Sequence, residues 1–149
     1  MNLFSRGAVT TDARTMKSGK PDIDLRLDGR AVSRCLIDYA FSLEFLESGV
    51  VTTIRIGGKL RLKHRELLIE IDPEDADEIG RASLLVRKTV DRAVAREDGS
   101  LEVSFTDGTI LSVSPQSDYE AWEAQAADGM KVVSLPGGGL SIWGVHDRR

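Results

Sequence analysis

The sequence predicts a mainly β protein (α+β with one short helix), folded as an antiparallel β roll or a small sandwich. Two observations carry this prediction. From residue 23 onward, apolar and polar residues alternate with a period of two, which is typical of half-buried strands. Turn-forming pairs such as Asp107-Gly108 and Asp128-Gly129 then interrupt these runs at short intervals. Strands joined by such short turns pair antiparallel with their neighbours.

Composition fits one globular domain. The chain has 149 residues, of which 41% are hydrophobic and 30% charged, and its net charge is −4. These values argue against disorder and against a protein that coats nucleic acid. The single cysteine, Cys35, excludes a disulfide framework, and no apolar run approaches the roughly 18 residues of a membrane span. We therefore expect a cytoplasmic protein that does not contact a membrane.

Three segments divide the chain. Residues 1–22 lack apolar periodicity and are interpreted as a flexible N-terminal leader. Residues 23–145 form a single β-rich domain, and 146–149 form a C-terminal tail. In chain order, strands are expected over residues 23–28, 32–38, 39–46, 50–56 and 59–71 (one or two strands), and in three short runs between 101 and 143.

One short helix is expected over Pro73–Leu85. Asp72 is suited to accept hydrogen bonds from the free N–H groups of the first turn, and proline is favoured at the first helical position. The acidic residues that follow favour the positive end of the helix dipole. We expect this helix to cover one edge or opening of the sheets.

Strand register is predicted from the apolar face. In the first hairpin, a four-residue loop over Leu46–Gly49 places Phe45 opposite Val50 and keeps the large apolar groups on one face. A shift of one residue would instead set Phe41 against Arg55. The four-residue loop is the prediction.

The later hairpin favours a three-residue loop, Thr106–Gly108, with Gly108 in the left-handed conformation. This loop places Leu101 opposite Val113, whereas a two-residue turn would place Leu101 opposite Ser114 and divide the apolar face. The two hairpin regions resemble each other at a separation of 58 to 60 residues. Either one supersecondary unit is duplicated, or any two strand-turn-strand segments look this similar.

Four short motifs follow one another in the C-terminal half. They are Phe105-Thr106-Asp107-Gly108, Val113-Ser114-Pro115, Tyr119-Glu120-Ala121-Trp122 and Pro136-Gly137-Gly138-Gly139-Leu140-Ser141-Ile142-Trp143. This pattern resembles a family of small, mainly actinobacterial proteins grouped as a domain of unknown function. Some members of such families accompany polymorphic toxins as immunity proteins, so the resemblance implies toxin neutralisation as a role. No catalytic residues are established for the family, so the resemblance assigns none to this chain.

Three aromatic residues, Tyr119, Trp122 and Trp143, are candidates for partner binding, because aromatic groups with a polar handle are common at interface hot spots. In a strand, Tyr119 and Trp122 would lie on opposite faces. The simpler interpretation, which we favour, is that all three fill the core or cap its ends.

Two charged groups are further candidates. The basic residues Lys59, Arg61, Lys63 and Arg65 alternate with apolar residues, and a strand there would present a basic stripe to phosphate or nucleic acid, or protect a sheet edge. The acidic residues Asp75, Asp77 and Glu78 lack the spacing of a calcium loop. They suit a helix start, and they would also steer a basic toxin towards the protein.

Few residue patterns in the sequence are suited to catalysis or cofactor binding. The two histidines, His64 and His146, are far apart in sequence, Cys35 has apolar neighbours, and Pro136–Gly139 lacks the lysine of a phosphate loop. We therefore expect no catalytic residues, no metal and no cofactor. The predicted function is a non-enzymatic protein-binding module, of the immunity type, whose partner is another protein, such as a basic toxin, or a second copy. The alternative is a cytoplasmic protein that binds nucleic acid or a ligand on the basic strand face.

Overall fold

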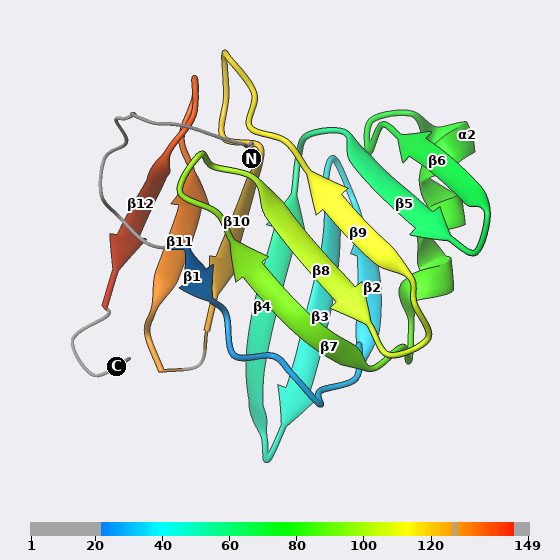
Figure 1. The fold of residues 1–149 in the computed structure, drawn as a ribbon, viewed down its shortest axis with the longest axis horizontal. Coiled ribbons are helices and arrows are strands. Elements are labelled where there is room, and N and C mark those ends of the chain that lie inside the picture. The colour runs from blue at the N-terminus through cyan, green and yellow to red at the C-terminus, as the bar shows by residue number, and fades with distance from the viewer. Residues whose placement is uncertain (1–21, 127, 145–149) are drawn as a thin grey trace.

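The computed structural model describes residues 22–126 and 128–144 as two antiparallel six-stranded sheets that face each other as a sandwich (Figure 1). The predicted leader, except for Asp22, and the predicted tail lie outside these residues. In spatial order, the β3 sheet contains β12 (Leu140–Trp143), β11 (Lys131–Ser134), β10 (Trp122–Gln125), β4 (Val50–Ile56), β3 (Phe41–Glu47) and β2 (Arg34–Ile37). The β8 sheet contains β1 (Ile23–Asp24), β7 (Val90–Ala95), β8 (Leu101–Phe105), β9 (Ile110–Val113), β5 (Leu60–His64) and β6 (Leu67–Ile71). The predicted fold class is confirmed.

The core lies between the inner faces of the two sheets. Period-two alternation buries Phe41, Leu43 and Phe45 of β3 on one side. On the other side it buries Val103 and Phe105 of β8. Because residues from both sheets belong to one contiguous apolar cluster, each sheet shields the apolar face of the other from water.

The two halves of the chain exchange hairpins. The meander β2-β3-β4 belongs to the β3 sheet, and the next hairpin, β5-β6, crosses to pair with β9. The meander β7-β8-β9 belongs to the β8 sheet, and the next strands, β10 to β12, cross back to pair with β4. The strand order therefore has the approximate two-fold pattern that a repeated unit predicts.

Equivalent residues follow the same pattern. Leu43 lies opposite Ile54 in the first meander, and Val103 lies opposite Leu111 in the second. After the crossovers, Leu60 pairs with Val113 and Trp122 with Ile56. The equivalence thus extends from the meanders to the exchanged hairpins.

One predicted hairpin register is confirmed and one is wrong. Leu101 pairs with Val113 and Gly108 has a φ of +92°, as the three-residue loop requires. In the first hairpin, however, Phe45 pairs with Thr52, and the loop is the two-residue turn Ser48-Gly49. Both turn residues have positive φ, which matches the right-handed twist of the flanking strands. A shift of two residues preserves the apolar face, so the pattern alone did not distinguish the two registers.

The helical segment begins later than predicted. It consists of α2 (Ala76–Ile79) and the 3-10 helix η1 (Gly80–Leu85), and Asp75 rather than Asp72 is its cap. The oxygens of Asp72 instead accept from the N–H groups of Glu74 and Asp75 in the preceding turn. Similarly, the first strand ends at Asp24 rather than at residue 28, because Arg26 has a φ of +59°. Within the described residues, no helix has the length and apolar character to span a bilayer.

Candidate functional site

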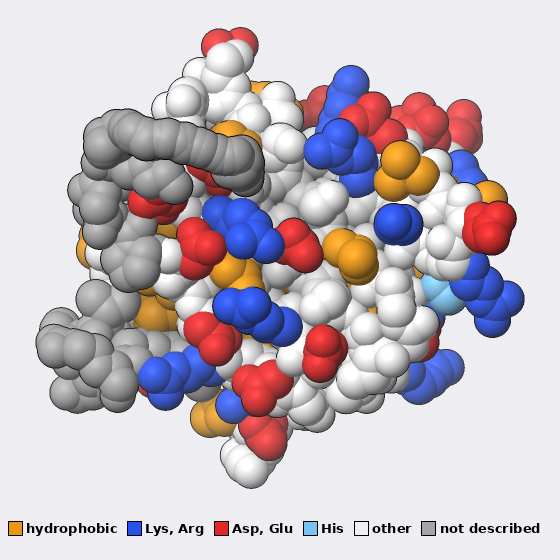
Figure 2. Space-filling view, viewed as in Figure 1, with side chains coloured by type: hydrophobic (Ala, Val, Ile, Leu, Met, Phe, Trp, Pro, Cys, Tyr) orange, Lys and Arg blue, Asp and Glu red, His pale blue; other side chains and the backbone are white. Residues whose placement is uncertain are grey.

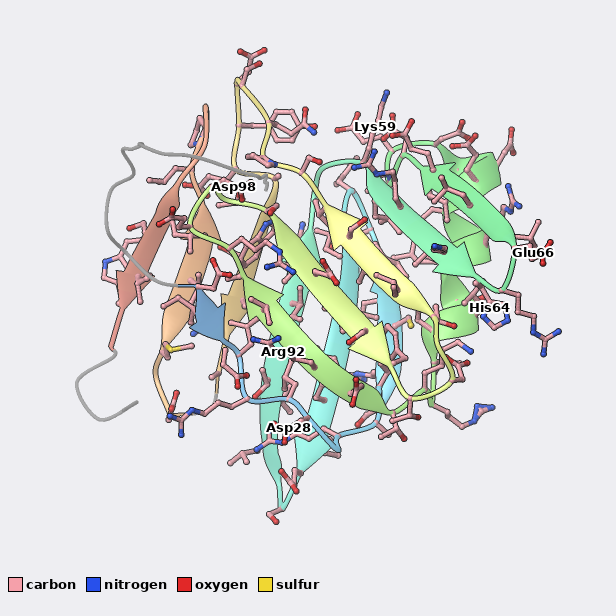
Figure 3. All side chains as sticks on the ribbon, in the orientation of Figure 1. Asp28, Lys59, His64, Glu66, Arg92 and Asp98 are labelled. Carbon is pink, nitrogen blue, oxygen red and sulfur yellow. The ribbon has the colours of Figure 1, made fainter. Side chains whose placement is uncertain are left out.

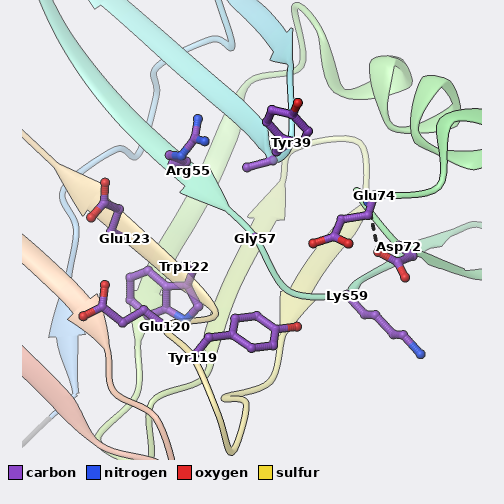
Figure 4. Close-up of a pocket in the computed structure, with 11 residues that line it drawn as sticks. Tyr39, Arg55, Gly57, Lys59, Asp72, Glu74, Tyr119, Glu120, Trp122 and Glu123 are labelled. Carbon is purple, nitrogen blue, oxygen red and sulfur yellow. Dashed lines mark hydrogen bonds between the residues drawn. The ribbon is translucent and has the colours of Figure 1, made fainter.

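The candidate site is a pocket of about 520 Å³ at the end of the sandwich where the chain crosses between the sheets. The two crossovers meet there, since the Ala121 carbonyl accepts hydrogen bonds from the N–H groups of Gly57 and Gly58, both at 2.9 Å. The pocket lies between these crossovers, the β2–β3 loop (38–40) and the turn after β6 (72–74) (Figure 4). We call it the open site.

Two exposed tyrosines border the open site. Tyr39 is 87% exposed and Tyr119 is 45% exposed, and they lie on opposite sides of Gly57 (Figure 4). Asp38 fixes the loop that carries Tyr39, because its carboxylate accepts from the Ala40 N–H at 2.7 Å and from Arg55 at 3.1 Å. The bond from Ala40, followed by that from Arg55, lowers the pKa of Asp38. Tyr39 is therefore held in place while its ring stays in solvent.

The charges of the open site are predominantly negative. Four carboxylates and two cations line it, and Arg55 is already paired with Asp38. Glu123 has Lys131 at 3.5 Å. Among the described residues, the carboxylates of Glu74 and Glu120 have no ion pair, and the Glu74 carboxylate points into the pocket while Lys59 points away (Figure 4). The unpaired charge that faces a ligand is therefore acidic.

An equivalent site in the other half is filled. There the β7–β8 loop (96–100) and the crossover after β9 meet the turn after β11 (135–139), and we call this the filled site. Gly139 N–H donates to the Asp98 carbonyl at 2.9 Å, and Gly137 N–H donates to the Gln116 carbonyl at 2.7 Å. Figure 3 shows that Asp98, in the filled site, and Lys59, in the open site, lie at the same end of the sandwich. The glycine run predicted to be a turn between strands is thus the segment that fills this space.

Of the three candidate aromatic residues, Tyr119 and Trp122 line the open site and Trp143 does not. Trp122 is 1% exposed and donates its indole N–H to the Gly99 carbonyl at 2.9 Å, so it belongs to the core. Tyr119 is in the crossover before β10 rather than in a strand. Trp143 is 53% exposed, and the ammonium of Lys131 lies 6.0 Å from its ring. Trp122 thus fills the core, as the simpler interpretation predicts, whereas Tyr119 and Trp143 are not core residues, and whether they cap its ends stays a prediction.

The acidic candidates extend the rim of the open site. Asp75 and Asp77 are exposed on the first turn of α2, directly after the turn that lines the pocket. Glu78 is half-buried and accepts from the Asp72 N–H at 3.4 Å. Acidic side chains gather near α2 in the space-filling view (Figure 2). These residues therefore add negative charge beside the pocket.

The basic stripe is present but is not a continuous basic patch. Arg61 and Lys63 are exposed on β5, while Lys59 lines the open site and Arg65 lies in the β5–β6 turn. Across β6, Arg61 faces Glu70 and Lys63 faces the apolar Leu68. β5 is flanked by β9 and β6, so the stripe does not protect a sheet edge. Acidic and basic side chains are interspersed over this face (Figure 2).

The remaining titratable candidates are structural in character. His64 Nδ1 lies 2.6 Å from the hydroxyl of the buried Thr109, which links the two hairpins of the β8 sheet. Burial raises the pKa of Cys35 to about 11, so its thiol stays protonated at neutral pH. His146 lies outside the described residues. Within those residues, no group of three His, Cys, Asp or Glu side chains is placed to hold a metal ion.

Sequence reasoning did not single out Tyr39 and Glu120 as site residues, and it recognised Glu74 only as one of the acidic residues at the predicted helix start. Each belongs to a different loop, and only the exchange of hairpins between the sheets brings those loops to one pocket. A tyrosine flanked by a turn-forming aspartate in Asp38-Tyr39 was the only local signal.

The described residues therefore form a two-sheet antiparallel sandwich with exchanged halves and a loop-lined pocket at the crossover end. The chain belongs to the family of unknown function DUF6188, whose sequence pattern matches residues 23–144. The match covers both halves and names no activity. Neither the curated proteins nor the solved structures contain a match to this chain.

Proposed function

We propose that this protein is a non-enzymatic protein-binding module of the toxin-neutralising, immunity type, and that its partner binds at the open site. The observation that carries the proposal is the pair of solvent-exposed tyrosines, Tyr39 and Tyr119, at a pocket lined by four carboxylates and two cations, one of which is paired with Asp38. Exposed aromatic residues are costly to leave in water and are enriched at interface hot spots.

Electrostatics favours a basic partner. Asp75 and Asp77 extend the acidic surface beyond the pocket, and such a surface accelerates the encounter with a positively charged protein. A nuclease-type toxin has this charge because its substrate is a polyanion. We propose that the protein acts in the cytoplasm, where a single unpaired cysteine is common. We also propose that its relatives are mainly actinobacterial and that some of them have immunity roles.

The alternative, nucleic-acid or ligand binding on the β5 face, has weaker support. Glu70 lies opposite Arg61, so a phosphate backbone placed along the stripe would also meet a carboxylate. Self-association is a third prediction, and the exposed Leu67 and Leu68 on the edge strand β6 are its natural location.

Coexpression with the product of each adjacent gene tests the proposal. We expect one product to be toxic alone, to be tolerated with this protein, and to form a complex measurable by calorimetry. No toxic neighbour and no complex would contradict the proposal, and salt-dependent retention on nucleic acid would favour the alternative.

Association kinetics sharpens the test. Neutralising Asp75, Asp77 and Glu78 together removes charge beside the pocket, so the association rate at low salt should fall about 10-fold. The matched control is the triple variant Asp28→Asn, Glu66→Gln, Asp91→Asn, which removes the same charge from exposed positions elsewhere. Equal association rates for the two triple variants would show that the acidic residues of α2 do not steer the partner.

A further inference from the structure

The filled site indicates what kind of group suits the open site. In the second half, the space between loop, crossover and turn is filled by the chain itself, through hydrogen bonds from Gly137 and Gly139 to two other segments. In the first half, the equivalent turn after β6 satisfies its groups internally: Glu74 N–H donates to the Asp72 carboxylate at 3.0 Å. No hydrogen bond among the described residues connects turn 72–74 to loop 38–40 or to Gly57 and Gly58. The open site therefore has room for a loop of a partner chain, at the position where a loop of this chain lies in the filled site.

The side chains of the open site select a cation. Glu74 and Glu120 would repel a phosphate or carboxylate, Arg55 is committed to Asp38, and Lys59 points away from the pocket (Figure 4). The faces of the Tyr39 and Tyr119 rings attract a positive charge. Negative charge and aromatic faces therefore favour the same class of ligand.

Among biological cations, the guanidinium group matches this combination best. It is planar, stacks on tyrosine rings, and donates two parallel hydrogen bonds to one carboxylate. An ammonium group is a strongly hydrated point charge and makes less use of flat rings. A pocket of about 520 Å³ also accommodates a side chain of this length together with water.

We propose that the open site binds an arginine side chain presented by a loop of the partner protein, with its guanidinium against Tyr39 and Tyr119 and hydrogen-bonded to Glu74, whose carboxylate points into the pocket (Figure 4). This rests on the proposed protein-binding function and names the residue that the pocket recognises. It also assigns the two tyrosines and Glu74 as the specificity-determining residues.

The test is a nuclear magnetic resonance titration of the full-length protein with two capped tripeptides, Gly-Arg-Gly and Gly-citrulline-Gly, which have nearly the same shape and differ in charge. We expect the arginine peptide to shift the amide signals of Tyr39, Gly57 and Tyr119 with saturation in the millimolar range, and citrulline to bind at least about 10-fold more weakly. Tyr119→Ala should weaken arginine binding about 3-fold and Glu74→Gln about 5-fold.

Glu66→Gln is the matched control, because it removes the same charge from the β5–β6 turn, at the opposite end of β6 from the pocket (Figure 3), and it should leave binding unchanged. Equal binding of the two peptides, shifts confined to β5, or no saturable shift at about 20 mM peptide would overturn the inference. A toxin complex that keeps its affinity in Tyr119→Ala and Glu74→Gln would overturn it too, while leaving the protein-binding function intact.

Discussion

The open site and the filled site occupy equivalent positions in the two halves of the sandwich, yet they differ in the turn that follows the crossing hairpin. After β11, the turn Pro136–Gly139 reaches across to the loop at Asp98 and to Gln116. After β6, the turn at Asp72 closes on itself and continues into α2. The same strand order therefore produces a closed end in one half and a pocket in the other.

The residues at the two sites follow from this difference. Close backbone approach in the filled site requires glycine, and a Cβ on Gly99 would lie 2.9 Å from the backbone N and O of Gly139. The open site instead exposes charged and aromatic side chains that contribute little to packing. The comparison teaches that the glycine-rich motif serves the fold, while exposed charged and aromatic side chains from both halves line the open site.

The largest effect is expected from Gly99→Ala. The added methyl group would overlap the turn of the filled site, and Gly99 has a φ of +97°, so we expect a loss of about 3 kcal/mol in the free energy of unfolding. Gly108→Ala is the control, because its φ of +92° is similar and its Cβ would meet nothing within 4 Å. It should cost about 1 kcal/mol. Equal losses in urea denaturation would show that the turn does not pack as described.

A smaller, coupled effect is expected around the Gly99 carbonyl. It accepts from the Trp122 indole N–H at 2.9 Å and from the Ser134 hydroxyl at 2.7 Å, both buried. Trp122→Phe and Ser134→Ala should each cost about 1 to 2 kcal/mol, since one hydrogen bond remains. The double variant leaves a buried carbonyl without a donor from either side chain, so its loss should exceed the sum. Simple additivity in a double-mutant cycle would contradict this shared bond.

The hairpin turns of the two halves differ in their pH dependence. Asp107 in the β8–β9 turn lies 2.6 Å from the Lys88 ammonium, and this bond, followed by that from the Thr109 N–H, holds the pKa of Asp107 well below its usual value of 3.8. Because the folded-state pKa is depressed, the stabilisation is complete well above pH 3.8 and is lost as the pH falls through the folded pKa.

Asp107→Asn should therefore lower the free energy of unfolding by about 0.5 kcal/mol at pH 7, a value limited by solvent screening of this exposed pair. The difference from the unsubstituted protein should shrink as the pH is lowered below 3.8. The Ser48-Gly49 turn of the first half lacks an ionisable side chain, so Ser48→Ala serves as the control, with an effect independent of pH. A difference for Asp107→Asn that is constant from pH 7 to about pH 2 would rule out the ion pair as its cause.

The smallest effect on stability is expected from the tyrosines of the open site. Tyr39→Ala and Tyr119→Ala should each change the free energy of unfolding by less than about 0.5 kcal/mol, because both rings are exposed and the backbone bonds of their loops remain. Thermal denaturation measures this directly. A loss above 2 kcal/mol, the scale of a core aromatic residue, would mean that the rings pack against the protein rather than lie in solvent.

The sequence predicted what depends on neighbouring residues. Alternation indicated the strands, and a left-handed glycine after Asp107 indicated the three-residue loop that the structure confirms. The register predicted for the first hairpin was wrong because two registers that differ by two residues bury the same side chains. There, turn conformation at Ser48-Gly49 decided the outcome.

The candidate site was harder to predict because it depends on the exchange between sheets. Tyr119 was recognised from its motif, but its exposure follows from the crossover, which separates it from the strand that begins at Trp122. Tyr39 and Glu74 lie 35 positions apart in sequence and meet only because β5 and β6 join the opposite sheet. Periodicity carries no information about such long-range placement.

Amide hydrogen exchange compares the two sites most directly. The N–H groups of Gly137 and Gly139 are bonded to segments on the far side of the filled site, so their exchange should require extensive unfolding and be nearly as slow as that of the central strands. The N–H groups of Glu74 and Asp75 are bonded only within their own turn and should exchange through local opening, many times faster. Equal protection of the two turns would contradict the distinction between a filled and an open site.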